Sequence, residues 1–312
     1  MTFVEPHNSE LAGLPRFRHL GVILDYDGLR YNPSDDIIFP SIVRTSPWLP
    51  TGSPRYFMYY APHDAPGGIC LATADRLAGP WREYDANPVI GRTWAPHYDV
   101  SHVSSPHAVW NDDEGLLFLY FHGDNDVTRL ATSKDGIHFD YAGPVVTIAD
   151  FDGTSESSYA RIFRYDLPGT DARWIMLLMG NCGGNRPIFF ASSRDGRTWT
   201  TKREPLILPP PGYADVGSPW HFPWQGKHYI LLHAHEDGEN RPFSSIHAYE
   251  VDAAFTETRR LGLFYDRSSV SPENERHSDV FTIEEDGTLY LVTDIGMRLH
   301  QKIALAVEDG TW

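Results

Sequence analysis

Short apolar runs separated by turn residues recur along the whole chain, and none of the longer segments has the period of a helix. Five of the runs can be aligned on one another, at residues 39–43, 105–109, 159–163, 218–222 and 277–281. Their second positions fall at 40, 106, 160, 219 and 278, so successive copies are 66, 54, 59 and 59 residues apart. This spacing predicts one supersecondary unit that is repeated five times.

Each copy continues into two further apolar runs. The second run is rich in aromatic residues and the third in small and aliphatic ones; they lie at 56–60 and 69–73 in the first copy, and at 116–120 and 129–132 in the second. β-Branched and aromatic runs bounded by Gly, Asn and Asp are typical of strands. Two copies end in an Asp-Gly turn, where Asp135 and Asp195 are expected to cap a hairpin, followed by an aromatic residue that begins a fourth strand. The pattern predicts an all-β protein, a five-bladed β-propeller with four-stranded antiparallel blades.

The last copy has no room for a fourth strand, because the sequence ends at Trp312 soon after the third. We expect residues 17–24 to supply the missing outer strand and to close the ring, so that residues 1–312 form a single domain. The alternative is a β-sandwich or two stacked sheets, neither of which requires a five-fold register.

Composition narrows the range of partners. The chain has 26 basic and 42 acidic residues and a formal net charge of −16, which disfavours binding to nucleic acid or to an anionic membrane. No apolar run is long enough to span a membrane, and the first residues show no features of a secretory signal. The two cysteines, Cys70 and Cys182, are too few for a disulfide framework. We therefore expect free thiols and a cytoplasmic location.

Candidate site residues gather where the first strand of each repeat would line the central channel. The aligned third positions are unlike one another, and polar residues also stand just before these strands, where the chain would enter the channel. Convergent polar groups in a concavity predict a binding site. A lectin would repeat the same binding site in every blade. A different residue at the third position of every repeat therefore favours a single catalytic centre. The third positions are Ser41, His107, Arg161, Trp220 and Asp279, and the upstream residues are Asp35, Asp36, Asp99, His102, Glu156, Asp215, Glu275 and His277.

The repeat architecture, the Asp-Gly-x-x-Trp turn at 195–199 and the segment Tyr31-Asn32-Pro33 resemble the five-bladed propeller glycosidases. The nearest likeness is to glycoside hydrolase family 43, with families 32, 62, 117 and 130 as more distant relatives. The resemblance covers nearly the whole chain at the level of architecture. It implies cleavage of a glycosidic bond by a base, a modulator and an acid on the first strands of the first three blades. This chain departs from that pattern, since Phe39, His107 and Ser158 stand at or nearest the positions of the three carboxylates.

Hydrolysis of a glycoside generally needs one protonated and one ionised carboxyl group. We expect Glu156 to be the general acid and Asp36 to be the base. The alternatives without a catalytic role are a solvated loop glutamate for Glu156 and a solvated turn or strand-entry cap for Asp36. Asp279 is a candidate for base, for sugar ligand or for the ion-pair partner of Arg161. Substrate contacts are expected from Asp99, His102, His107, Arg161, Asp215, Trp220, His221 and His277.

No cofactor and no catalytic metal is expected. The segment His233-Ala-His235 places two imidazoles on one strand face, a spacing that also suits a divalent cation in the channel. Hydrogen bonding to sugar hydroxyls is the preferred use of the histidines. The loops at 60–68, 121–125 and 180–186, which follow the second strands of three repeats, are expected to be structural.

The sequence therefore predicts an exo-acting glycoside hydrolase whose partner is an oligosaccharide. Two alternatives stay open. A glycoside phosphorylase or lyase-like enzyme would use Arg161 and the histidines, and a phosphorylase should show basic side chains gathered beside the acid. A carbohydrate-binding propeller without turnover is the alternative outside the enzymes.

Overall fold

The computed structural model describes residues 9–236, 243–265 and 276–312. The first residues of the chain, on which the expectation about secretion rests, lie outside this part. The described residues form an all-β protein with three short 3-10 turns, η1 (Ser9–Leu11), η2 (Tyr26–Gly28) and η3 (Ile148–Asp150). Within the described ranges, no helix has the length and apolar character needed to cross a membrane.

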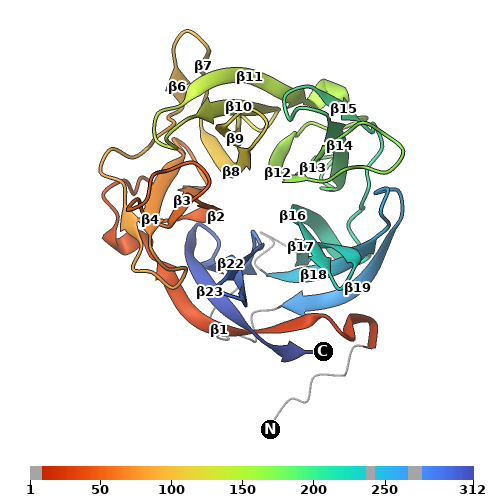
Figure 1. Ribbon diagram of the computed structural model, residues 1–312. Helices are drawn as coiled ribbons and strands as arrows, with labels where there is room; N and C mark the ends of the chain where they lie inside the picture. Colours follow the sequence, from red (N-terminus) through yellow and green to blue (C-terminus); the bar gives the residue numbers. More distant parts are fainter. Residues whose placement is uncertain (1–8, 237–242, 266–275) are drawn as a thin grey trace.

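Three four-stranded antiparallel sheets follow one another along the chain, each ordered as in the sequence. The third sheet runs from the innermost β12 to the outermost β15. A two-stranded hairpin, β6 (Thr93–Trp94) with β7 (Tyr98–Asp99), projects at the outer edge (Figure 1). The three sheets consist of β2 (Ile38–Arg44), β3 (Tyr56–Ala61), β4 (Cys70–Ala74) and β5 (Arg82–Glu83); β8 (Val103–Asn111), β9 (Leu116–Gly123), β10 (Val127–Ser133) and β11 (Asp140–Thr147); and β12 (Ser158–Arg164), β13 (Trp174–Met179), β14 (Ile188–Ser193) and β15 (Trp199–Thr201).

The remaining strands form a nine-stranded sheet made of two parts. A single residue pair, Ser244 with Arg276, joins the parts through β18 and β20. β1 lies antiparallel beside the last strand, β23, and is the outer strand that the last repeat was predicted to borrow. The first part holds β16 (Tyr213–Trp224), β17 (Lys227–Glu236), β18 (Ser244–Val251) and β19 (Thr258–Tyr265); the second holds β20 (Arg276–His277), β21 (Phe281–Glu285), β22 (Thr288–Met297), β23 (His300–Thr311) and β1 (Pro15–Leu24).

All of the sheets surround a common centre, and β2, β8, β12 and β16 are the strands nearest to it (Figure 1). The core lies between neighbouring sheets rather than in one central layer. Leu71 of the first sheet, for example, packs in one cluster with Leu119 of the second, and Leu177 of the third packs in another with Ile230 of β17. The apolar faces that the repeats expose are thus buried against the next repeat.

The aligned repeats share an irregularity of the backbone. Phe39, Ser105, Tyr159 and Ser218 have φ values of 62°, 55°, 54° and 46°. Each is the first position of its repeat, and at each the pairing with the second strand shifts register. In the fifth copy the strand is interrupted between β20 and β21. A bulge with a left-handed non-glycine residue re-aims the side chains around it and is typical of functional edges.

The two Asp-Gly turns are structural, as predicted. The Asp195 carboxylate accepts the backbone N–H groups of Arg197 at 2.8 Å and Thr198 at 2.9 Å, and Asp135 caps its own turn in the same way. Each turn is also bound to the preceding sheet. The Tyr120 hydroxyl donates to the Gly196 carbonyl at 2.6 Å, and the Tyr59 hydroxyl donates to the Gly136 carbonyl at 2.6 Å. These buried hydrogen bonds hold adjacent sheets in register.

The substitution Tyr120→Phe is expected to lower the free energy of unfolding by about 1–2 kcal/mol, because it leaves the Gly196 carbonyl without its donor in a buried place. Urea denaturation measures this change. Tyr290→Phe is the matched control, since no hydrogen bond of its hydroxyl is found among the described residues, and it should change the free energy by less than about 0.5 kcal/mol. Equal effects of the two substitutions would contradict the role of the inter-sheet bond.

Candidate active site

A cavity of about 340 Å³ opens where the first strands begin. Strands or loops of the three four-stranded sheets and of the nine-stranded sheet reach it, and its volume is at the lower end of the range for small-molecule sites. A second cavity of about 160 Å³ adjoins it and shares Phe39, His63, Asn125 and Tyr159. The first cavity is lined by Ile38, Phe39, His63, Asn125, Tyr159, Met179, Arg186, Asp215, His233, His235, Arg276, Ser278, Asp279, Arg298 and Gln301.

The loops after the second strands supply several of these residues. His63 follows β3, Asn125 follows β9 and Arg186 follows β13. The expectation that these loops are structural is therefore corrected. In an antiparallel pair, the end of the second strand lies beside the beginning of the first, so both reach the same rim.

Asp279 is a buried carboxyl group in the cavity wall. Its Oδ1 lies 3.4 Å from a terminal nitrogen of Arg161, and its carboxyl group also hydrogen bonds with that of Asp294 in β22. Burial raises the pKa of Asp279 to about 6, although the charge of Arg161 lowers it. Burial, followed by the negative charge of Asp279, raises the pKa of Asp294 well above its usual range. The two carboxyl groups therefore hold a proton between them near neutral pH.

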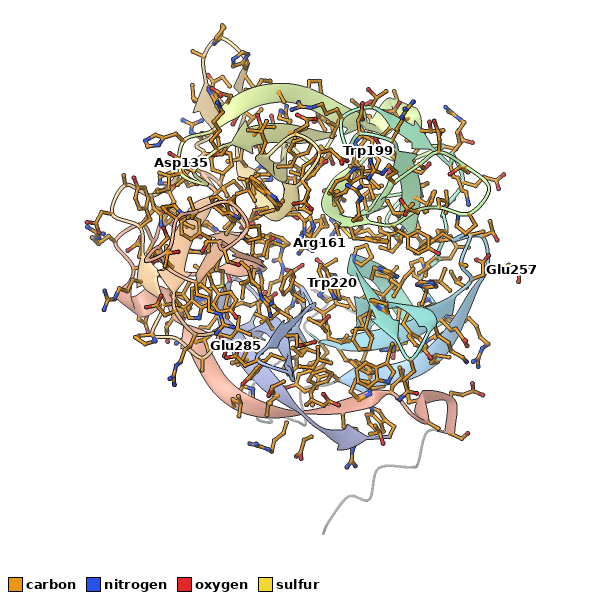
Figure 2. All side chains as sticks on the ribbon, in the orientation of Figure 1. Asp135, Arg161, Trp199, Trp220, Glu257 and Glu285 are labelled. Carbon is orange, nitrogen blue, oxygen red and sulfur yellow. The ribbon has the colours of Figure 1, made fainter. Side chains whose placement is uncertain are left out.

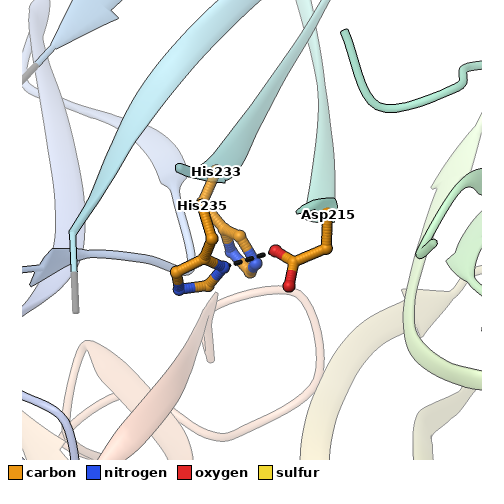
Figure 3. Close-up of side chains that lie close together, drawn as sticks. All are labelled: Asp215, His233 and His235. Carbon is orange, nitrogen blue, oxygen red and sulfur yellow. Dashed lines mark hydrogen bonds and ion pairs between the residues drawn. The ribbon is translucent and has the colours of Figure 1, made fainter. Parts of the chain in front are cut away.

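Asp215 is the other carboxyl group in the cavity wall among the described residues. Figure 3 shows it on β16, facing His233 and His235 of β17. His235 Nδ1 lies 2.5 Å from Asp215 Oδ1, and Nε2 of the same ring is buried without a hydrogen-bond partner. Burial lowers the pKa of both histidines. His235 is thus a neutral imidazole that donates from Nδ1 and offers the lone pair of Nε2 to a ligand.

A glycine makes room for this group. A Cβ atom on Gly217 would lie 2.5 Å from His233 Nε2 and 3.0 Å from the Met179 sulfur. His233 therefore packs against bare backbone, and only glycine at this position allows its present place.

Asp215, His233 and His235 are also the residues that could hold a metal ion. One ligand atom from each lies within 4.8 Å of the others, and neutral imidazoles with a carboxylate suit a divalent transition metal. Burial is the largest cause of the low pKa of both histidines. Asp215 raises the pKa of each, and the charges of Arg276 and Arg186 lower it by less.

The expected acid and base lie behind the cavity wall. Glu156 is buried, where it accepts a hydrogen bond from the Ser158 hydroxyl at 2.6 Å and lies 3.4 Å from Nε of Arg186. Asp36 is buried and accepts the backbone N–H groups of Gln301 at 2.7 Å and His63 at 3.3 Å. Neither carboxyl group lines the cavity. Each instead holds residues that do.

Three predicted channel residues lie deeper. Figure 2 shows Arg161 and Trp220 near the centre of the molecule. His107 is buried, its Nε2 lies 2.6 Å from the Ile162 carbonyl, and burial lowers its pKa to about 3. The Trp220 indole donates to the Thr282 hydroxyl at 2.7 Å and packs on Phe281. None of these three lines either cavity. In the first and third repeats the residue at the bulge, Phe39 or Tyr159, lines the cavity instead.

Of the remaining residues that were predicted to contact substrate, some lie at a cavity and others do not. His102 lines the smaller cavity. Asp99 is exposed in the β6–β7 hairpin and accepts from Thr93, His221 stacks on Phe163, and His277 is enclosed beside Tyr265. Local contacts that the sequence does not display thus turn these three away from the cavity.

Several lining residues were missed. Gln301 lines the cavity from the third strand of the last repeat. Asp294 is buried behind the wall in the second strand of that repeat, and its one signal is a charged residue within the apolar run of β22. Arg276 precedes the fifth repeat, and Arg298 lies in the β22–β23 turn. A turn arginine carries no sequence signal that separates it from a solvated one.

No family model matches the chain. A segment is 29% identical over 164 residues to a probable sucrose-6-phosphate hydrolase of Psychromonas ingrahamii. The match covers 46% of this chain and only 27% of that protein.

Solved structures of glycosidases share the fold. One is a structure from glycoside hydrolase family 130, a family of mannoside phosphorylases that contains hydrolases of β-1,2-mannosidic linkages in Candida mannan. It has a TM-score of 0.66 at 16% identity, and the match covers 96% of each chain. The catalytic domain of a Coprinopsis cinerea family 62 α-L-arabinofuranosidase has a TM-score of 0.63 at 11% identity and covers 94% of this chain and 97% of its own. The Bombyx mori family 32 β-fructofuranosidase BmSUC1 has a TM-score of 0.61 at 15% identity. The match covers 93% of this chain and 61% of that protein's chain. The fold is that of the propeller glycosidases, as the sequence resemblance predicts.

The pKa of Asp279 should respond to Arg161. Arg161→Met removes the positive charge that lowers this pKa, so the value should rise above about 6. Carboxyl ¹³C NMR of labelled aspartate measures it, with the exposed Asp140 as an internal reference. Circular dichroism verifies the fold of the variant, and an unchanged pKa in a folded variant would contradict the assigned electrostatics.

Proposed function

We propose that the protein is a glycoside hydrolase that removes a terminal sugar from an oligosaccharide. The observation that carries this proposal is the pair of carboxyl groups in the cavity wall. Asp279 is a buried acid with a pKa of about 6, and Asp215 is held by a neutral histidine. Two carboxyl groups in unlike environments are what glycoside hydrolysis requires.

Asp279 acts as the general acid. It gives its proton to the oxygen of the glycosidic bond as that bond to the anomeric carbon breaks, and Arg161 then faces the aspartate anion. Asp215 acts as the second carboxylate, with its orientation fixed by the bond to His235. It takes a proton from the water whose oxygen forms the new bond to the anomeric carbon. Asp36 and Glu156 are positioning residues, because they hold His63 and Arg186 at the wall. This reaction needs no cofactor.

The size of the cavity supports exo action. A space of about 340 Å³ suits one terminal sugar better than an open chain. We also infer that the sheets are the five blades of a propeller, and that the pairing of β1 with β23 closes the ring. What supports this is the five-fold sequence repeat and the bulge shared by its first four copies.

A phosphorylase is the second candidate. Arg186, Arg276 and Arg298 line the same cavity as Asp279. Basic side chains gathered beside the acid are expected in a phosphorylase, where they would hold the phosphate, and these three arginines meet that expectation.

Asp279→Asn should lower kcat by about 10²–10⁴-fold on aryl glycosides and oligosaccharides, which is the usual contribution of a general acid. Asp36→Asn and Glu156→Gln should have smaller effects, since these carboxyl groups only position others. Asp140→Asn is the control for loss of an exposed aspartate. Full activity of Asp279→Asn would refute the assignment, and so would a larger loss in Glu156→Gln.

The pH dependence should follow the proton on Asp279. The acid is active while protonated, so kcat/KM should fall as the pH rises through about 6. A pH–rate profile of the wild-type protein measures this limb. A limb well above pH 8 would point to another acid.

A further inference from the structure

The positive charge of the cavity is concentrated in three arginines from separate elements. Arg186 follows β13, Arg276 lies in β20 and Arg298 lies in the turn between β22 and β23. The chain as a whole has a net charge of −16. The same cavity wall also holds the carboxyl groups of Asp215 and Asp279.

Several arginines elsewhere are paired with close acids. Arg55 lies 2.7 Å from Asp286, Arg197 lies 2.6 Å from Glu114, and Arg203 lies 2.6 Å from Asp152. For Arg298, by contrast, no ion pair is found within the described ranges. Arg186 pairs with Glu156, with Nε 3.4 Å from the carboxylate.

Arg276 and Arg298 line the same cavity and carry like charges. Burial lowers the pKa of the Arg276 guanidinium, and the charge of Arg298 is the next largest cause, whereas the charges of Asp215 and Asp294 raise this pKa. Two guanidinium groups in one cavity repel, and an anion between them would relieve that repulsion. A guanidinium has a planar fork of donors that matches a carboxylate or phosphate in a bidentate way.

We propose that Arg276 and Arg298, with Arg186 beside them, form an oxyanion subsite in the cavity, and that the sugar bound there carries a carboxylate or phosphate group. The inference rests on the proposed glycoside hydrolase function and gives its substrate class. His235 and Asp215 then contact the neutral hydroxyls of the same sugar, since His235 Nε2 is buried and has no hydrogen-bond partner. Free phosphate offers the same chemistry, and if it occupies the subsite the enzyme is a phosphorylase.

Isothermal titration of the full-length protein tests the subsite without relying on turnover. The probes are matched pairs, glucuronate with glucose, galacturonate with galactose and glucose 6-phosphate with glucose, together with inorganic phosphate. The anion of at least one pair, or inorganic phosphate, should bind at least 10-fold more tightly than the neutral sugars, and the binding should weaken with salt.

Arg298→Gln should lower anion affinity at least 10-fold and leave the affinity for neutral sugars unchanged, while Arg298→Lys should retain part of it. Arg194→Gln is the matched control, because Arg194 is exposed and lies outside the cavity wall. If an anionic sugar binds preferentially, the anion held by the subsite is part of the sugar substrate. If phosphate alone binds, the subsite holds a phosphate co-substrate.

The inference is overturned if no anion binds better than its neutral partner, or if Arg298→Gln and Arg194→Gln behave alike. Hydrolysis of neutral aryl glycosides that is lost in Asp279→Asn would in that case leave the proposed function standing. Anion binding that depends on Arg298, without hydrolysis of any glycoside, would refute the function and keep the subsite.

Discussion

The burial of charge at the centre of the molecule is the constraint on which the site depends. Arg161 comes from β12, Asp294 from β22, and Asp279 from the break between β20 and β21. All three side chains are almost inaccessible to solvent. A lone charge in such a place would be costly, so the ion pair and the shared proton have to form together. The sheets that carry these residues are thereby fixed relative to one another.

The same arrangement gives the cavity its chemistry. An aspartate that faced water would be ionised at neutral pH, and one that met Arg161 alone would be ionised more strongly still. Desolvation outweighs the arginine at Asp279, and its pKa rises to about 6. Asp215 faces a different environment, with a short hydrogen bond from an uncharged imidazole. Position within the sheets thus gives two identical side chains different behaviour.

Strand repetition could be predicted from the sequence because it has a local signal. Apolar runs, turn residues and the Asp-Gly hairpins are visible along the chain, and so is the short final repeat that pairs with β1. The likeness to propeller glycosidases follows from that architecture. Among the site residues, Asp279 and Asp215 were found because they stand at aligned positions or just before them.

The rest of the site could not be predicted because it depends on contacts between distant segments. Asp36 and Glu156 stand at the expected places in the sequence, but their oxygens are turned to His63, Gln301, Ser158 and Arg186. Apart from Ser158, those partners come from loops and strands distant along the chain. His107 lies outside the cavity wall, enclosed against the Ile162 carbonyl, and the bulge at Ser105 shifts the strand register just before it.

That bulge has a wider meaning. It recurs at one position of the first four repeats, in residues as different as Phe39, Ser105, Tyr159 and Ser218. The backbone path is therefore set by the strand pairing and not by the side chain that happens to occupy the kink. Natural variation can exchange the groups around the mouth one at a time while the framework beneath stays intact, and substrate preference can diverge faster than architecture.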